Sequence, residues 1–510
     1  MKIQISSFWK IVEKKGILLV FIITLTAFVS VDVYEVKIHL DYPVIGGVVT
    51  GDEPHYLAVT SEIIQRHNVY MDEYFSHQDP KLIWPHVYYN NSAYWESFQR
   101  DDGHWMMGGG PGVSFMLVPG YAVAGVFGAL VTMSALSSLT SVFIYKFTSN
   151  LSTPKIGFLT TIIFSFSTLL FTWSNQIYPD VVITLFLIVI LYVIFEKNQN
   201  NVHMAAAGAL VGFGFFLKIF FIILDLALIP LVFLLLLTHK INLKNFMVFL
   251  SFFIILTSLA IINNIYMYHS LVGGAEARLS LGAITPLHFL LNPPFSNGYS
   301  GYGVFGGGDT KTWAIPELIE IFFGKYHGLF IFSPVVMLSV LGIKSVLNKN
   351  RLLLTTIIII SALDIGSYTW MNPISSMDAI DSPFRYFLPT IPLMTIPFAL
   401  GLQKFSKNWI YRILISIFSV IGASFVFSFS FIGGRLAECC YNPIKGNLVH
   451  TIYQGFDFIL PSIGPLSHPE NHPFNSYNQI FVIVMIIMLS IGVLIPFFLK
   501  DKSKQVTKIV

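Results

Sequence analysis

Charged residues and cysteines are both scarce in this sequence. Asp, Glu, Lys and Arg make up 11% of the 510 residues, whereas an average soluble domain carries about 25%. With a mean hydropathy of +0.69, this shortage excludes an ordinary soluble protein. The net charge of +3 gives no indication of a nucleic-acid partner, and we expect none. Two cysteines are too few for disulfide bonds to build the fold.

Long apolar runs take the place of the missing charge. They are roughly 20 residues long, the length of a membrane-spanning helix, and short charged or Pro/Gly-rich breaks separate them. The sequence therefore predicts an all-α polytopic membrane protein with about twelve transmembrane helices. We place these spans near residues 16–31, 119–145, 156–174, 179–195, 203–217, 219–238, 245–266, 327–347, 352–371, 386–403, 409–431 and 478–499.

The lysines and arginines fix the expected orientation. Lys2, Lys10, Lys14 and Lys15 precede the first run without a clear cleavage site after it, which favours a signal anchor with the N-terminus inside. The basic residues of alternate later loops then also lie inside, and both termini are cytoplasmic. The alternative lies in 203–238, where one span plus a buried turn could replace two short helices around Lys218.

Four sizeable segments then face the outside: 32–118, 267–326, 372–385 and 432–477. They are rich in Tyr, Trp, Pro, Gly, Asn and His, which suits ordered loops and interfacial helices beside the membrane. We interpret residues 1–510 as a single transmembrane domain without an appended soluble domain, ending in a short basic cytoplasmic tail at 500–510. Function is expected in the external segments.

The motif Gly51–Leu57 (GDEPHYL) stands out in the first of these segments. Two adjacent carboxylates beside a membrane are costly unless they are paired, solvated or used. We interpret Asp52 as a catalytic base, with Glu53 positioning the acceptor or holding Asp52. The alternative is that the pair caps an amphipathic helix beginning near Pro54, since an acidic residue before a proline is a common helix start. The two interpretations are compatible.

Five motifs follow one another along the chain: Gly51–Leu57, Pro111–Pro119 (PGVSFMLVP), Asn263–Tyr266 (NNIY), Gly328–Pro334 (GLFIFSP) and Ser382–Pro389 (SPFRYFLP). In this order they resemble the GT-C glycosyltransferases, in particular the protein O-mannosyltransferase and aminoarabinose transferase group (glycosyltransferase family 39-like). The resemblance implies a GT-C fold and an enzyme that transfers a hexosyl or pentosyl group, with inversion, from a polyprenyl-phosphate carrier to a lipid, protein or glycan on the external face.

The resemblance also assigns residues to the donor phosphate. Arg385 matches a family arginine expected to meet the carrier phosphate, and its planar fork suits that role. The alternative is an interfacial arginine that snorkels or pairs with Asp378 or Asp381. Related proteins often have an arginine before the motif at Gly328, whereas this chain has Lys325 and His327, which become weaker candidates for the phosphate contact. The same motifs add His55, Tyr56 and Tyr386 as substrate-binding candidates.

A second departure from the family is Gly108–Pro111, where relatives often have a polar residue and where we expect an altered substrate entrance. Gly301–Gly306 satisfies a dinucleotide-binding pattern, but its external loop lacks the βαβ context, so a mobile lid or sugar-stacking loop suits it better. Cys439 and Cys440 are adjacent and are interpreted as structural or free thiols.

We expect no metal and no cofactor other than the lipid-linked sugar as co-substrate. The histidines and carboxylates of residues 32–118 match no defined metal-ligand spacing, and the transferases that the chain resembles generally work without one. The expected location is a bacterial inner membrane or an archaeal plasma membrane. Two other functions stay open: a transporter or flippase of lipid-linked sugars, and an oligosaccharide ligase or polymerase using His450, His468 or His472.

Overall fold

The computed structural model describes residues 2–41, 53–73, 97–100, 102–107, 109–196, 199–218, 221–268, 322, 328–371, 385–428 and 430. Several predictions therefore lie outside the described residues. They include the span at 478–499, the external loop 432–477 with its two cysteines, nearly all of the loop 267–326, and the tail 500–510.

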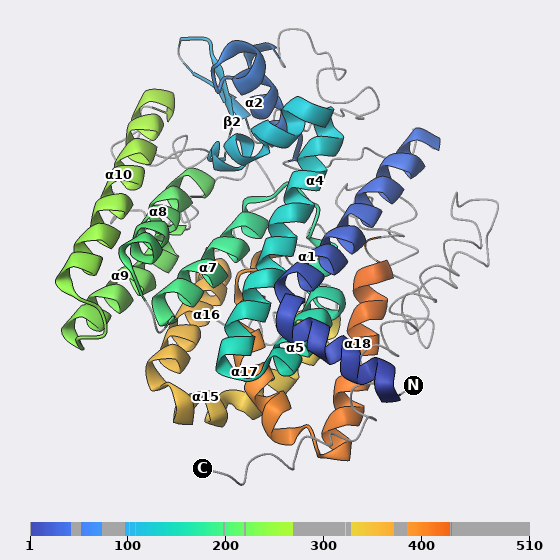
Figure 1. Ribbon diagram of the computed structural model, residues 1–510. Helices are drawn as coiled ribbons and strands as arrows, with labels where there is room; N and C mark the ends of the chain where they lie inside the picture. Colours follow the sequence, from blue (N-terminus) through green and yellow to red (C-terminus); the bar gives the residue numbers. More distant parts are fainter. Residues whose placement is uncertain are drawn as a thin grey trace.

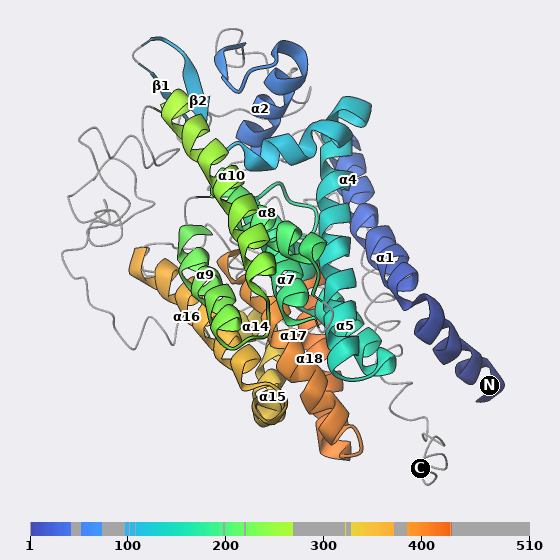
Figure 2. The ribbon, with the colours of Figure 1, turned by 60° about the vertical axis from the view of Figure 1, so that its left-hand side comes forward.

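The described chain folds into a bundle of helices with one small hairpin (Figures 1 and 2). The α-helices are α1 (Lys2–Asp41), α2 (Glu53–Arg66), α4 (Gly112–Leu151), α5 (Pro154–Ser167), α6 (Leu169–Thr172), α7 (Pro179–Phe195), α8 (Asn201–Leu217), α9 (Phe221–Leu237), α10 (Leu243–Tyr268), α14 (Leu329–Phe332), α15 (Ile343–Lys349), α16 (Arg351–Met371), α17 (Thr390–Phe405) and α18 (Trp409–Ser428). Two 3₁₀ helices, η4 (Pro334–Gly342) and η6 (Arg385–Phe387), and the antiparallel strands β1 (Ser97–Gln99) and β2 (Trp105–Met107) complete the set.

The bundle confirms a helical membrane architecture. Four described helices are long and apolar enough to cross a bilayer: Phe8–Tyr34, Gly112–Leu151, Leu243–Tyr268 and Trp409–Phe427. Shorter apolar helices lie at Pro154–Ser167, Pro179–Phe195, Asn201–Leu217 and Leu224–Leu237. These positions follow the predicted spans closely, while the number twelve stays a prediction.

The helix around the second predicted span differs from the expectation at both ends. We predicted a span at 119–145, but α4 covers Gly112–Leu151 and is interrupted at Ala124 and Gly125. Gly125 has φ +58°, a left-handed conformation that glycine adopts without steric cost. Hydropathy places the apolar segment, but the interruption depends on one glycine.

Two other predicted spans are broken, and the breaks contact each other. The span at 156–174 divides into α5 and α6 at Thr168. The span at 327–347 divides into α14 and η4 at Ser333, and α15 follows η4 at Ile343. Pro334 lacks the N–H that a continuous helix needs. The Ser333 hydroxyl accepts a hydrogen bond from the Leu169 backbone N–H at 3.1 Å. One broken helix thus satisfies a backbone donor of the other.

Two separate helices, α8 and α9, confirm the two-helix interpretation of residues 203–238. Lys218 is the C-cap residue of α8, and α9 begins at Phe221. α8 also packs tightly on α10, because a Cβ built on Gly208 would lie 2.1 Å from the Phe249 carbonyl oxygen and one on Gly212 would lie 2.7 Å from that of Phe253. Small residues four apart are a common way for membrane helices to approach.

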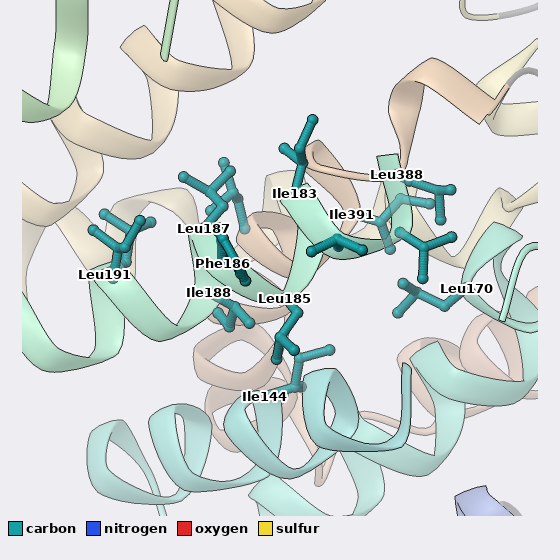
Figure 3. Packing of buried hydrophobic residues seen from close by; sticks show 14 of the residues in the cluster. Ile144, Leu170, Ile183, Leu185, Phe186, Leu187, Ile188, Leu191, Leu388 and Ile391 are labelled. Atoms are coloured by element: carbon teal, nitrogen blue, oxygen red, sulfur yellow. The ribbon is translucent and has the colours of Figure 1, made fainter. Parts of the chain in front are cut away.

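The core of the bundle is centred on α7. All but one of the residues from Pro179 to Ile194 are buried, and α7 packs against α4 and α8. Figure 3 shows Leu187, Ile188 and Leu185 of α7 directed toward neighbouring helices, with Ile144 of α4 and Ile391 of α17 nearby. A helix buried on all sides in this way fixes the positions of the residues at its ends.

Helix α2 lies at one end of this bundle, which we call the α2 end (Figure 1). It packs on α4, where the Ser114 hydroxyl donates a hydrogen bond to the Tyr56 carbonyl at 2.9 Å. The hairpin β1–β2 lies at the same end and contacts α10 through Arg100, whose guanidinium donates to the carbonyl oxygens of Tyr266 and Met267. The first predicted external segment is therefore anchored to two long helices.

Candidate functional site

The acidic motif connects to the start of α7 through Glu53. This residue opens α2, is 0% exposed, and its carboxylate accepts the Ile177 backbone N–H at 2.7 Å. Ile177 lies immediately before Tyr178, the N-cap residue of α7. A charge-assisted hydrogen bond of this length is among the stronger ones in proteins. Asp52, predicted as the base, lies outside the described residues, next to this connection in the sequence.

Two more residues of the motif are buried beside it. His55 is 3% exposed and Tyr56 is 5% exposed. A Cβ built on Gly109 would lie 3.1 Å from the Tyr56 hydroxyl oxygen, so this glycine leaves space for the tyrosine. Both side chains are thus buried within α2, and their role in substrate binding stays a prediction.

Asp180 is the charged residue of the first turn of α7. Pro179 occupies the first helical position, and the partial positive charge at a helix N-terminus favours an acidic residue just after it. The Asp180 side chain is 2% exposed. One carboxylate oxygen lies 3.3 Å from the Lys218 ammonium, and the other lies 4.0 Å from Arg385 Nε. Residues from three separate helical segments thus meet at one carboxylate.

Aromatic rings surround the two cations. The Arg385 guanidinium carbon lies 4.1 Å from the ring centre of Tyr178 and 5.2 Å from that of Tyr386, whose hydroxyl accepts from Arg385 Nη2 at 3.3 Å. The Lys218 ammonium lies 4.7 Å from the Tyr386 ring centre. Cation–π contacts orient such groups and stabilise them where water is scarce. We call Lys218, Arg385 and Asp180 the charged cluster.

A further acid lies near the charged cluster. Asp364 of α16 is 5% exposed and accepts a hydrogen bond from the Thr390 hydroxyl at 2.7 Å. It lies within electrostatic range of both Asp180 and Lys218. The start of α7 therefore brings buried cations together with buried carboxylates, an arrangement that can hold an anionic group and move a proton.

The structure brings together some of the predicted residues. Arg385 and Tyr386 contact each other and lie in the charged cluster, rather than snorkelling to solvent, since the Arg385 side chain is only 10% exposed. Asp378 and Asp381, the alternative partners of Arg385, lie outside the described residues, as do Lys325 and His327. Glu53, His55 and Tyr56 are buried in α2, and Glu53 contacts the segment that leads into the cluster.

Sequence reasoning missed Asp180 and Tyr178 and noted Lys218 only as the residue between two short helices. A signal was present, because Tyr178, Pro179 and Asp180 open an apolar run. Proline followed by an acidic residue is also an ordinary helix start, so the pattern alone gave no reason to select Asp180. Its partner Lys218 is 38 residues away and is brought near only by the fold.

The glycine-rich segment before α4 packs against the helix end that carries Lys218. A Cβ built on Gly110 would lie 2.2 Å from the Phe216 carbonyl oxygen, and one on Gly112 would lie 2.7 Å from the same oxygen. A larger residue would push this part of α8 away. Gly110, which lies in the Gly108–Pro111 segment, and Gly112 therefore set a close backbone contact next to the charged cluster.

Comparisons with known proteins agree with this architecture. The family model described as dolichyl-phosphate-mannose-protein mannosyltransferase matches residues 109–264, from the start of α4 into α10. This segment includes Asp180 and Lys218 of the charged cluster. A comparison with curated proteins finds no match.

The similar solved structures include ArnT and an oligosaccharyltransferase. ArnT from Cupriavidus metallidurans in the apo state matches with a TM-score of 0.50 and 12% identity, covering 96% of this chain and 76% of ArnT. The same protein bound to undecaprenyl phosphate matches with a TM-score of 0.50, 13% identity and coverages of 96% and 77%. The Archaeoglobus fulgidus oligosaccharyltransferase gives 0.47, 12% identity and coverages of 91% and 64%.

The helices, their order and the fold shared with ArnT over nearly the whole chain agree with the resemblance drawn from the sequence motifs. The chain has the fold of the GT-C superfamily of membrane glycosyltransferases.

Proposed function

We propose that the protein is an inverting glycosyltransferase that moves a hexosyl or pentosyl group from a polyprenyl-phosphate-linked donor to a lipid, protein or glycan acceptor on the external face of a bacterial inner or archaeal plasma membrane. The observation that carries this proposal is the convergence of Lys218 and Arg385 at one buried point, beside the helix that begins with the acidic motif. The ArnT structure bound to undecaprenyl phosphate supports a carrier of this chemistry.

The charged cluster suits a phosphate because it offers several donors of fixed orientation. Arg385 presents up to five N–H groups and Lys218 three, and the rings of Tyr178 and Tyr386 hold the guanidinium in place. Cations that are already oriented stabilise the charge that develops on a leaving phosphate. At 18% and 10% side-chain exposure, Lys218 and Arg385 are shielded enough from water for this effect to be strong.

The chemistry follows from this placement. An acceptor hydroxyl attacks the anomeric carbon, and the bond from that carbon to the phosphate oxygen breaks. The bonding electron pair leaves with the phosphate, and Asp52 takes the hydroxyl proton as general base. A phosphate leaves without a strong general acid, so one base and the two cations suffice, unlike the carboxyl pair of a glycosidase. We propose that neither a metal nor another cofactor takes part.

Glu53 contributes by holding the motif in place. Its hydrogen bond to the Ile177 N–H links the residue after Asp52 to the segment that carries Tyr178 and Asp180. In this proposal a buried contact thus connects the motif that carries the base with the segment beside the phosphate-binding cations. Correct mutual placement of reacting groups is a large part of enzymatic rate enhancement.

The test is mass spectrometry of polyprenyl-phosphate sugars in host cells that lack the protein. The cells are complemented with wild type, Asp52→Asn, Arg385→Gln or the control Arg351→Gln, whose side chain is exposed at the start of α16. We expect one lipid-linked sugar to accumulate in the null cells and with the first two variants, and to fall with wild type and the control. Immunoblots confirm equal membrane levels.

Rates with the purified protein sharpen the result. Loss of a general base lowers turnover by about 10²–10⁴-fold. Loss of charge-assisted hydrogen bonds worth about 1.5–3 kcal/mol lowers it roughly 10- to 100-fold for Arg385→Gln. If Asp52→Asn acts like wild type, the assignment of the base is wrong. If the lipid-linked sugar only changes sides of the membrane without being consumed, the protein is a transporter.

A further inference from the structure

We propose that Asp180 is an internal counter-ion which occupies the cations of the phosphate site when no carrier is bound, is displaced by the donor phosphate, and helps to expel the product phosphate. The inference rests on the proposed function, since it assigns a regulatory role within the same site. It concerns the cycle of phosphate binding and release and leaves the bond-breaking step unchanged.

The first support is that one carboxylate faces both cations. Its two oxygens lie 3.3 Å from Lys218 Nζ and 4.0 Å from Arg385 Nε. Two buried positive charges facing the same space are unfavourable unless a negative charge balances them. Asp180, at 2% side-chain exposure, supplies that charge from within the protein. An anion that enters the same space must compete with it.

The second support is that the contacts between Asp180 and the two cations are longer than typical ion-pair hydrogen bonds. Charge-assisted N–H···O hydrogen bonds are typically about 2.7–2.9 Å long, whereas the two distances here are 3.3 and 4.0 Å. The guanidinium also lies against the rings of Tyr178 and Tyr386, which help to orient it. The carboxylate thus balances the cations without binding them tightly, which suits a ligand that has to be exchanged.

The third support is the change of charge during the reaction. The donor is a phosphodiester with one negative charge. The carrier phosphate released is a monoester, whose second pKa is near 6, so its charge approaches −2 at neutral pH. A product bound more tightly than the donor would stay in the site and slow turnover. Because Asp180 competes for the same cations, it lowers the affinity for the product and favours release.

The experiment measures binding of undecaprenyl phosphate to the purified full-length protein in nanodiscs, with undecaprenol as the neutral control lipid. Wild type is compared with Asp180→Asn, Asp180→Glu, Asp364→Asn, Arg385→Gln and Lys218→Gln. Asp364→Asn is the matched control, because it replaces another buried carboxyl group within electrostatic range of Lys218, one that is hydrogen-bonded to Thr390.

We expect Asp180→Asn to bind undecaprenyl phosphate roughly tenfold more tightly than wild type, with undecaprenol binding unchanged. Without lipid this variant melts at a lower temperature, and the phosphate lipid raises its melting temperature by more than it raises that of wild type. We expect Asp364→Asn to change affinity less than threefold. Asp180→Glu keeps the charge and extends it toward the cations, so its affinity is at or below that of wild type.

Different failures separate the two proposals. If Arg385→Gln and Lys218→Gln weaken binding but Asp180→Asn does not tighten it, the counter-ion role is wrong and the phosphate site stands. An equal gain in Asp364→Asn would show a general effect of charge and would also overturn the counter-ion role. If wild type does not distinguish undecaprenyl phosphate from undecaprenol, or the two cation variants bind as wild type does, the phosphate site itself fails. Should Asp180→Asn not fold, tighter binding by Asp180→Glu still contradicts the inference.

Discussion

The first turn of α7 and the rest of that helix are both buried, but for different reasons. From Val181 to Ile194 the helix is almost entirely apolar and contacts α4, α8 and α17 through side chains that fit together (Figure 3). Its first turn carries Asp180, an acid with two cationic neighbours. In the apolar part the side chains are buried because they pack against neighbouring helices, and such packing drives association between membrane helices. In the first turn burial surrounds a charge, which is unfavourable without partners.

This comparison shows that burial by itself does not locate a site. In the described part of the chain, Asp180 and Leu187 are both nearly inaccessible to water. The packing of apolar side chains explains the burial of Leu187, but it does not explain the burial of a charged residue such as Asp180. The useful signal is a buried charge with oppositely charged neighbours from other helices. The predictions that follow separate the two kinds of burial, beginning with the largest expected effect.

Leu187→Ala tests the packed part of α7. The side chain is 0% exposed, so its removal leaves a cavity and costs about 2–5 kcal/mol of unfolding free energy. We expect a lower melting temperature in detergent and unchanged affinity for undecaprenyl phosphate below the transition. Leu237→Ala, at a side chain 60% exposed, is the control and should melt as wild type does. Lower affinity with unchanged melting would contradict the distinction between the two regions.

Substitutions of Glu53 test the hydrogen bond that joins the acidic motif to the segment just before α7. Glu53→Ala leaves the buried Ile177 N–H without this acceptor, which costs about 1–3 kcal/mol, whereas Glu53→Gln keeps a neutral acceptor and loses about 1 kcal/mol. We expect hydrogen exchange of the segment 174–180 to speed up strongly in the alanine variant and weakly in the glutamine variant. Equal exchange in both variants and wild type would show that Glu53 does not hold this segment.

The sequence predicted the positions of the helices well because the hydropathy of each apolar run depends only on its own residues. It failed where a helix breaks, since the break at Thr168 and the break at Ser333 are stabilised by a hydrogen bond between residues 164 positions apart. The extension of α1 to Asp41, ten residues beyond the predicted span at 16–31, was missed because the added residues are no longer uniformly apolar.

The candidate site was predictable only in part, for the same reason. Arg385 and the acidic motif were selected as candidates because they belong to recognisable short motifs. Asp180 was missed because Pro179 and Asp180 resemble any helix start, and its contact with Lys218 exists only in the folded chain. Local patterns identify single residues, whereas the balance of charges that gives the cluster its chemistry is long-range.

Glu62→Gln tests a buried acid away from the charged cluster and has the smallest expected effect. Burial in α2 raises the pKa of Glu62 above its ordinary value of 4.5, although the neighbouring Arg66 opposes the shift. The folded state therefore favours the protonated form, so the stability from this group is present below about pH 4.5 and is lost as the pH rises through the folded pKa. Glutamine stays neutral and avoids that loss.

We expect Glu62→Gln to melt at a higher temperature than wild type between pH 4.5 and pH 7. The gain in unfolding free energy is less than about 1 kcal/mol, because the ion pair to the exposed Arg66 is lost at the same time. Affinity for undecaprenyl phosphate should not change. Glu73→Gln removes the other Arg66 ion pair, from a more exposed side chain, and is the control. A gain that is independent of pH would mean that Glu62 is destabilised by packing. In that case the distinction made for α7, between side chains buried by packing and buried charges, would not apply to acids outside the charged cluster.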